Sequence, residues 1–149
     1  MDNKLEFAKQ FGATDLVNAS LVNPVETVRN LTEGEGVDYA FEVVGLPKTI
    51  QQAFNSLTKC GIAITVGLAP FQSKVSIPIG PLVFEEKTLR GSLYGSSRPR
   101  IDILKLIDLY HAGKLKLDEL ITHTYPLEKI GDAFAALDRG KVARAIILF

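Results

Sequence analysis

The chain has 149 residues, of which 46% are apolar, and this is enough for one compact domain with a real core. Its 17 basic and 17 acidic residues balance, which argues against a nucleic-acid surface and against a polybasic membrane surface. The single cysteine, Cys60, allows neither an internal disulfide nor a cysteine zinc cluster. Because the longest apolar runs are too short to span a bilayer and no leader opens the chain, we expect a cytoplasmic protein.

Helical and strand-like patterns alternate along the chain. In chain order, they predict a helix over 4–11, a strand over 15–18, a helix over 24–31, a strand over 37–44, a helix over 47–57, a strand over 61–68, a loop over 70–81, a strand over 88–94, a helix over 100–111, a strand over 122–125, a helix over 127–137 and a strand over 142–149. Asn23 and Pro24 are a typical N-cap and first helical residue. The nearly continuous apolar run 61–68 indicates a strand that is buried on both faces. Strands that alternate with helices in this way predict an α/β fold with a mostly parallel sheet.

Few residues of the chain have the spacing of a catalytic or metal site. Gly34-Glu35-Gly36 precedes a strand, so a helix-to-strand turn explains it better than a dinucleotide fingerprint, which follows a strand. His111 and His123 have no second ligand at metal-binding spacing, and structural roles are expected for both. Cys60 is expected to be a buried or half-buried inert thiol.

Small or glycine-bearing turns follow three of the predicted strands. They contain Val43-Val44-Gly45, Val66-Gly67-Leu68 and Ser92-Leu93-Tyr94-Gly95. Open α/β sheets bind ligands at the carboxyl ends of their strands, and glycine lets the backbone approach a flat ring closely. Together the turns could form a flat slot for nicotinamide. The alternative is that the glycines simply reverse the chain, and composition alone favours this second interpretation.

A resemblance to a known family bears on this choice. The matching segments are KLEFAKQFGAT (4–14), VDYAFEVVG (37–45), ITVGLAP (64–70), LRGSLYGS (89–96), DELITHTYPLEKIGDAF (118–134) and ARAIILF (143–149). In order and spacing, they resemble the carboxy-terminal part of the zinc-type medium-chain alcohol dehydrogenases, over essentially the whole chain. The resemblance implies a partial Rossmann-like, doubly wound parallel sheet that lacks its first two strands. It also implies two domains, a partial NAD-binding domain over 1–96 and a C-terminal helix and return segment over 97–149.

The resemblance implies a coenzyme role for ten residues of this chain. Lys4 matches a lysine near the adenosine ribose, and Arg144 matches an arginine that reaches the pyrophosphate. The remaining matches concern the nicotinamide end of the coenzyme: Val43, Val44 and Gly45 in the turn over the coenzyme, Val66, Gly67 and Leu68 in the segment whose backbone meets the carboxamide, and Ser92 and Tyr94, whose backbone carbonyl and amide complete that grip.

The family's other functional parts have no counterpart in this chain. The phosphate-binding G-x-G-x-x-G, the acidic ribose ligand and the zinc ligands are expected to precede Met1 in the family's order. We therefore expect no catalytic and no metal-binding residue here, NAD binding that is weak or absent, and no turnover by the chain alone. The alternatives are a part of a zinc-free quinone or enoyl reductase, or a non-catalytic assembly module.

The expected lack of two central strands has a consequence for association. An open gap in a sheet does not persist, so we expect the strand over 15–18 to pair beside the strand over 37–44, or elements to be exchanged with a second chain. We also expect a homodimer formed by sheet extension through 88–94. We expect no binding to nucleic acids and none to membranes.

Overall fold

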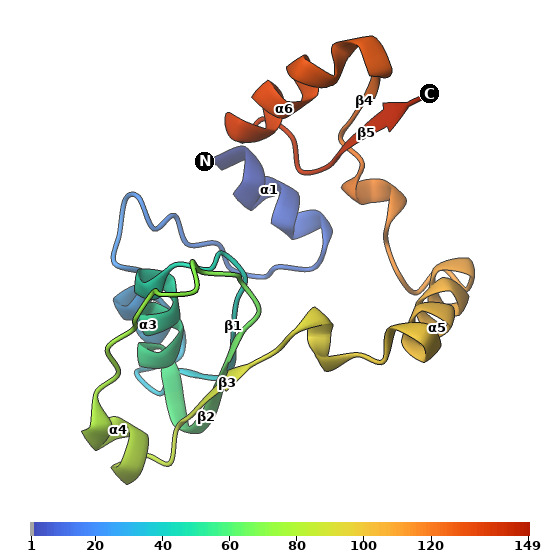
Figure 1. The fold of residues 1–149 in the computed structure, drawn as a ribbon. Helices are drawn as coiled ribbons and strands as arrows, with labels where there is room; N and C mark the ends of the chain where they lie inside the picture. Colours follow the sequence, from blue (N-terminus) through green and yellow to red (C-terminus); the bar gives the residue numbers. More distant parts are fainter. Residues whose placement is uncertain (1) are drawn as a thin grey trace. The chain divides into compact units, whose positions relative to one another are not determined.

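The computed structural model describes residues 2–149, which form two compact units (Figure 1). The first unit contains Thr14–Ser97 and the beginning of the chain up to Leu5. The second unit contains Glu6–Ala13 and Arg98–Phe149. Helix α1, Asp2–Gln10, therefore has residues in both units.

Two helices of the first unit begin where the local chemistry predicts, and a third does not. The side-chain oxygen of Asn23 accepts a hydrogen bond from the backbone N–H of Val25 at 3.1 Å, and α2 follows over Pro24–Leu31. Helix α3 spans Pro47–Asn55, again with proline in its first turn. Helix α4, Ile79–Phe84, lies partly within the loop expected over 70–81, because proline at the third helical position costs no hydrogen bond within the helix.

A parallel three-stranded sheet forms the centre of the first unit. Strands β1 (Val37–Glu42), β2 (Leu57–Thr65) and β3 (Thr88–Gly91) lie in the order β1-β2-β3. One face of the sheet packs on α3, where Phe54, Leu57 and Ala63 are the buried centre of the core. The prediction of an α/β fold with a parallel sheet is confirmed.

The prediction of a strand over 15–18 is wrong. These residues have no strand conformation, and Asn18 forms a turn, with its backbone carbonyl accepting the N–H of Leu21 at 2.9 Å. A strand exists through its ladder of hydrogen bonds, and 15–18 has no neighbouring strand within the described chain. The expected pairing beside the strand over 37–44 is therefore also wrong for the single chain.

Strand β2 differs from the expected strand over 61–68 in extent and burial. It begins at Leu57 and contains an irregularity in register against β1, where Cys60 adopts a φ of 58°. Cys60 is exposed, whereas the sequence led us to expect a buried or half-buried thiol. Gly61 and Ala63 are buried, whereas Ile62 and Ile64 on the other face are only half-buried, since α3 covers one face alone.

The second unit contains a separate two-stranded parallel sheet. Strand β4 (His123–Pro126) pairs with β5 (Ala145–Leu148), and α6 (Ile130–Asp138) packs on both strands. The last strand was predicted over 142–149 and spans only Ala145–Leu148, where the first three residues are half-buried and Leu148 is exposed. Helix α5 spans Pro99–His111 as predicted, yet it contains no buried residue.

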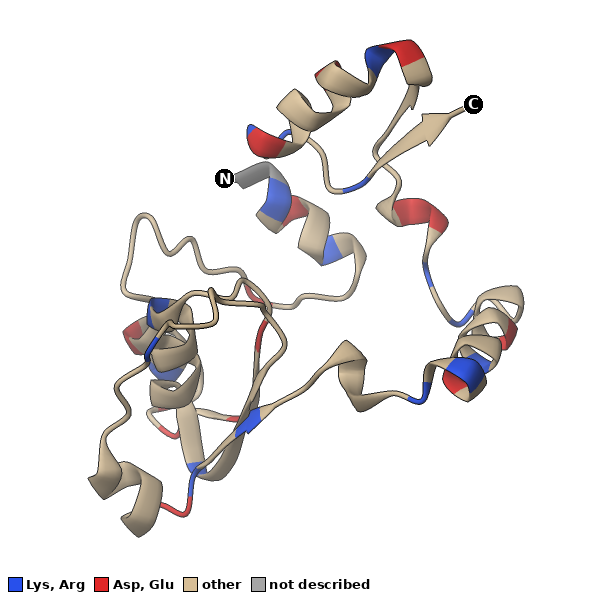
Figure 2. Ribbon diagram, in the orientation of Figure 1, with Lys and Arg blue, Asp and Glu red and all other residues tan. Residues whose placement is uncertain are grey.

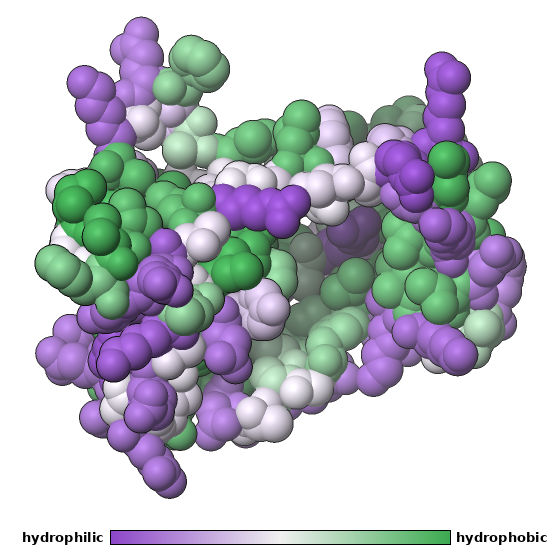
Figure 3. All heavy atoms as spheres, turned by 90° about the horizontal axis from the view of Figure 1, so that it is seen from below, coloured by the Kyte–Doolittle hydropathy of each residue, from purple (hydrophilic) through white to green (hydrophobic). Residues whose placement is uncertain are grey.

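The surface of both units carries charges of both signs and much apolar area. Lysine, arginine, aspartate and glutamate are interspersed, for example along α5 (Figure 2). Broad hydrophobic areas are visible on the face drawn in Figure 3. Within residues 2–149, no helix has the length and apolar character needed to cross a membrane.

Candidate functional site

The carboxyl ends of β1, β2 and β3 are tied together by backbone hydrogen bonds. The carbonyl oxygen of Glu42 accepts the N–H of Val66 at 2.8 Å and the N–H of Gly67 at 3.1 Å. The carbonyl oxygen of Thr65 accepts the N–H of Ser92 at 2.9 Å. The three turns that the sequence singled out therefore lie side by side at one edge of the sheet, as parallel strands require.

Gly45 and Gly67 allow the first two turns to touch backbone to backbone. A Cβ atom on Gly67 would lie 2.1 Å from the backbone nitrogen of Gly45, and one on Gly45 would lie 2.6 Å from the carbonyl carbon of Leu68. Gly45 also has a φ of 84°, in the left-handed region. The structure thus requires both glycines to bring the two turns together, whether or not a ligand approaches them.

The third turn has an unusual backbone. Tyr94, Gly95 and Ser96 have φ values of 50°, 67° and 53°, so three consecutive residues are left-handed. The turn is closed by the Ser96 N–H, which donates to the carbonyl of Leu93 at 2.8 Å. Within the described residues, the Ser92 carbonyl and the Tyr94 N–H make no backbone hydrogen bond to a loop or turn. These two groups are the acceptor and the donor that a carboxamide needs.

The turns present apolar side chains to solvent. Val43, Val44, Leu68 and Tyr94 are between 63% and 84% exposed. Next to the third turn, a hollow of about 250 Å³ lies on the sheet face that α3 does not cover, and it is lined by Tyr39, Phe41, Ile62, Ile64, Arg90, Ser92, Gly95 and Ser96. An apolar wall with a few backbone polar groups suits a flat, weakly polar ring.

The two remaining candidate residues are charged and exposed. Lys4 lies in α1, and Arg144 lies in the loop before β5 in the second unit. The backbone carbonyl of Arg144 accepts hydrogen bonds from the N–H and the hydroxyl of Thr122, at 3.0 and 3.1 Å. These bonds fix the backbone at Arg144 and leave its guanidinium for other contacts. The residues that the structure brings together are therefore those of the three turns.

Glu42 is the residue of this site that the sequence interpretation missed. It is the last residue of β1, and only 4% of its surface is exposed. Its Oε1 atom accepts hydrogen bonds from the N–H groups of Val44 and Gly45 and from the hydroxyl of Thr49. Burial raises the pKa of Glu42, but these bonds and the nearby backbone N–H of Leu46 outweigh it, so the pKa lies below its ordinary value. The available signal was a carboxylate at the carboxyl end of a strand, directly before one of the glycine-bearing turns.

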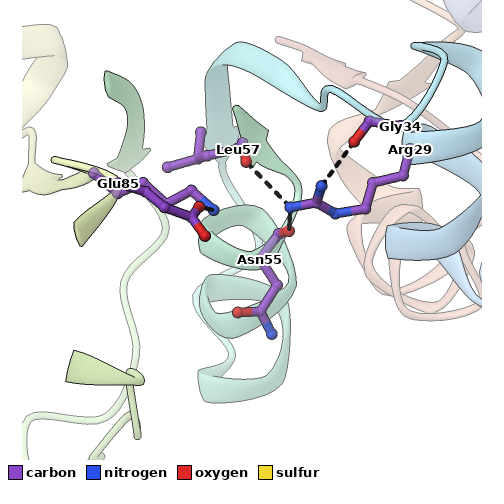
Figure 4. Close-up of polar contacts among 6 residues, drawn as sticks. Arg29, Gly34, Asn55, Leu57 and Glu85 are labelled. Atoms are coloured by element: carbon purple, nitrogen blue, oxygen red, sulfur yellow. Dashed lines mark hydrogen bonds and ion pairs between the residues drawn. The ribbon is translucent and has the colours of Figure 1, made fainter. Parts of the chain in front are cut away.

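The opposite end of the sheet is held by Arg29 of α2 (Figure 4). Its guanidinium donates to the carbonyl of Gly34 at 2.9 Å, to that of Asn55 at 3.1 Å and to that of Leu57 at 3.3 Å. These carbonyls lie just before β1, at the end of α3 and at the start of β2. Arg29 thereby ties together the starts of β1 and β2, whose other ends carry two of the three turns.

Zinc does not fit this part of the protein. Among residues 2–149, no group of three or more histidine, cysteine, aspartate or glutamate side chains is placed to hold a metal ion. The two histidines and one cysteine of the whole sequence are too few for the usual sets of nitrogen and sulfur ligands.

Comparison with known proteins identifies the family. The zinc-binding dehydrogenases match residues 1–112, three quarters of the chain. The chain belongs to the zinc-binding dehydrogenase family. This confirms the resemblance to alcohol dehydrogenases inferred from the sequence segments.

Individual relatives agree with this family. The chain is 38% identical to alcohol dehydrogenase-like 5 of Arabidopsis thaliana, over 97% of its own length and 38% of that protein. It is 38% identical to an NDMA-dependent alcohol dehydrogenase of Amycolatopsis methanolica, over 97% of its length and 40% of that protein. The benzyl alcohol dehydrogenase of Acinetobacter calcoaceticus has the same fold, with a TM-score of 0.92 and 30% identity over 99% of this chain and 40% of that one. This zinc-binding dehydrogenase chain thus spans about two fifths of the length of its relatives.

Proposed function

We propose that this chain forms the nicotinamide side of the NAD site of a zinc-type alcohol dehydrogenase. The parent activity is the reversible oxidation of an alcohol to an aldehyde or ketone by hydride transfer to the coenzyme. The observation that carries the proposal is the shared edge of the three turns, where the Ser92 carbonyl and the Tyr94 N–H make no backbone bond to a loop or turn among the described residues. The family to which the chain belongs supports the choice of reaction.

The turns would divide the work of holding the nicotinamide. Val43, Val44 and Gly45 would cover one face of the ring, and the backbone of Val66, Gly67 and Leu68 would meet its carboxamide, together with Ser92 and Tyr94. Arg144 would bind the pyrophosphate, because a guanidinium makes bidentate bonds to phosphate oxygens. Lys4 would lie near the adenosine ribose. When bound, NAD supplies the hydride acceptor, and these residues orient it.

The chain by itself is proposed to be inactive. In the zinc-type enzymes, a metal ion polarises the substrate oxygen. The ligand set for such an ion does not fit the residues of this chain, and the resemblance places it in the part of the family's sequence that has no counterpart here. Measurable alcohol turnover by the purified chain would contradict this proposal.

Titration with NADH tests the coenzyme proposal directly. We expect at most weak binding, seen as enhanced nicotinamide fluorescence at NADH concentrations up to the millimolar range, and we expect Arg144→Ala to abolish it because a charged phosphate contact is lost. Lys141→Ala is a matched control, because it removes an exposed positive charge from the same loop. NADPH titrated in parallel distinguishes the two coenzymes. Absence of binding by the unmodified chain would overturn the proposal.

A second candidate function is assembly with another chain, and the exposed sheet edge favours it. Strand β3 is the last strand of the β1-β2-β3 order, and all four of its residues are exposed. A homodimer extended through 88–94, or an exchange of elements, would pair this edge. We expect the amide protons of Thr88–Gly91 to exchange more slowly as the protein concentration rises. Exchange that does not depend on concentration, together with monomeric sedimentation, would exclude the dimer.

A further inference from the structure

The side chain and the main chain of Glu42 hold different turns of the candidate site. Its Oε1 atom lies 2.9 Å from the backbone nitrogen of Val44, 2.8 Å from that of Gly45 and 2.7 Å from the hydroxyl of Thr49. Its backbone carbonyl accepts the N–H groups of Val66 and Gly67. One residue therefore ties the Val43–Gly45 turn through its side chain and the Val66–Leu68 turn through its main chain.

The two oxygens of this carboxylate have very different surroundings. Oε1 accepts three hydrogen bonds, whereas Oε2 is buried and has no partner among the described residues. Burying a carboxylate is costly unless hydrogen bonds compensate it, and here all of the compensation comes from one turn and one helix. The carboxylate also lies close to the N-terminus of α3, because it bonds to Thr49 in the first turn of that helix. A negative charge at this place is favourable, and α3 has no other side-chain cap.

Besides the backbone contact of Gly45 with the second turn, the first turn is held by its hydrogen bonds to Glu42. Val43 and Val44 are exposed and contribute little packing. The N–H groups of Val44 and Gly45, which set the direction of the turn, both donate to Glu42. Loss of the carboxylate would leave the buried Gly45 N–H without an acceptor, at the place where the Gly45 backbone touches the second turn.

We propose that Glu42 is a positioning residue of the coenzyme site, whose carboxylate holds the Val43–Gly45 turn against the Val66–Leu68 turn so that both present one surface to the nicotinamide. This inference rests on the proposed function for its ligand. Its structural part, the dependence of the first turn on the Glu42 side chain, stands independently of any coenzyme.

Amide hydrogen exchange of the full chain, followed by NMR, tests the structural part. Glu42→Leu removes both oxygens at similar volume, and we expect the Val44 and Gly45 amides to exchange at least about tenfold faster, as for the loss of a charged acceptor. The Val66 and Gly67 amides should change less, because their acceptor is the main-chain carbonyl. Glu42→Gln keeps an acceptor oxygen and should restore part of the protection. Unchanged exchange at Val44 and Gly45 in Glu42→Leu would overturn the proposal.

Two further variants keep the test decisive if Glu42→Leu fails to fold. Thr49→Val removes one of the three donors while leaving the carboxylate, and it should disturb the first turn slightly. Glu42→Gln should then disturb it more than Thr49→Val does. If Thr49→Val and Glu42→Gln both leave the exchange of Val44 and Gly45 as in the unmodified chain, Glu42 does not hold the turn.

Ligand binding separates positioning from general stability. ADP-ribose lacks the nicotinamide, so Glu42→Gln should weaken NADH binding about fivefold or more while ADP-ribose binding changes less than about twofold. Equal losses for both ligands, or none, would overturn a role at the nicotinamide. If the unmodified chain binds neither ligand, the proposed function fails, and the exchange measurements alone decide whether Glu42 holds the turn.

Discussion

Glu42 makes the stability of the first unit depend on pH. Because its folded pKa is lowered, its carboxylate contributes stability at pH values above its unfolded pKa, and this contribution is lost as the pH falls through the folded pKa. We expect Glu42→Gln to be less stable by about 1–3 kcal/mol at neutral pH, since hydrogen bonds to a charged acceptor are lost.

Urea unfolding of the unmodified chain and of Glu42→Gln, between neutral and acidic pH, measures the difference in their free energies of unfolding. The two unfolding curves should converge at low pH, where the unmodified Glu42 is itself protonated. Glu128→Gln, at an exposed position, is the control and should show a small difference at every pH. A Glu42→Gln difference that stays constant down to acidic pH would contradict the assignment.

Gly67 offers a purely steric prediction. Its backbone is not in the left-handed region, so an added methyl group matters only through its contact, 2.1 Å from the nitrogen of Gly45. Gly67→Ala should lower the free energy of unfolding by about 2 kcal/mol or more, because two backbones would have to separate. Gly91→Ala, in β3, meets nothing within 4 Å and should leave stability nearly unchanged. Comparable unfolding midpoints for the two variants would show that the turns can separate freely.

Arg29 connects one helix to three other parts of the first unit. It links α2 to the start of β1, the end of α3 and the start of β2 through three carbonyl oxygens. Arg29→Met keeps the aliphatic stem and removes all of these donors, so we expect a loss of at least about 2 kcal/mol in the free energy of unfolding. Arg100→Met, at an exposed position of α5, should change it by less than about 0.5 kcal/mol. Equal effects of the two changes would mean that the Arg29 bonds contribute nothing.

Signals within a few neighbouring residues predicted most elements of this chain. The wrong or missed predictions depended on contacts between residues far apart in the sequence or brought together only by folding. Asn23 and Pro24 marked the start of α2 because capping chemistry is contained in a few neighbouring residues. The strand expected over 15–18 failed because a strand depends on a neighbour that the segment cannot specify. The three turns were predicted from glycine and strand ends. Glu42 was missed because its partners, Thr49 and the N–H groups of the turn, become neighbours only once the chain has folded.

The whole chain exposes far more surface than its mass requires. Its accessible surface is 11127 Å². A compact protein of 16.3 kDa exposes about 7,500 Å², and two separate compact domains of half that mass expose about 9,000 Å² together. Many large apolar side chains contribute to this surface, and Phe41 and Tyr39 are more than 60% exposed. An apolar surface of this kind is typical of one that other protein covers, and the relatives are about two and a half times as long as this chain.

The sheet face that α3 does not cover is the part of this apolar surface that can be tested. Phe41 lies beside Tyr39, Ile62 and Ile64 in the hollow next to the third turn, whereas the fully exposed Phe71 lies in a loop outside it. A contiguous apolar patch binds partners and hydrophobic dyes, but a single exposed side chain does so weakly. Phe41→Ser should therefore reduce dye fluorescence severalfold more than Phe71→Ser does. Equal reductions would mean that the sheet face is not the main apolar patch of this surface.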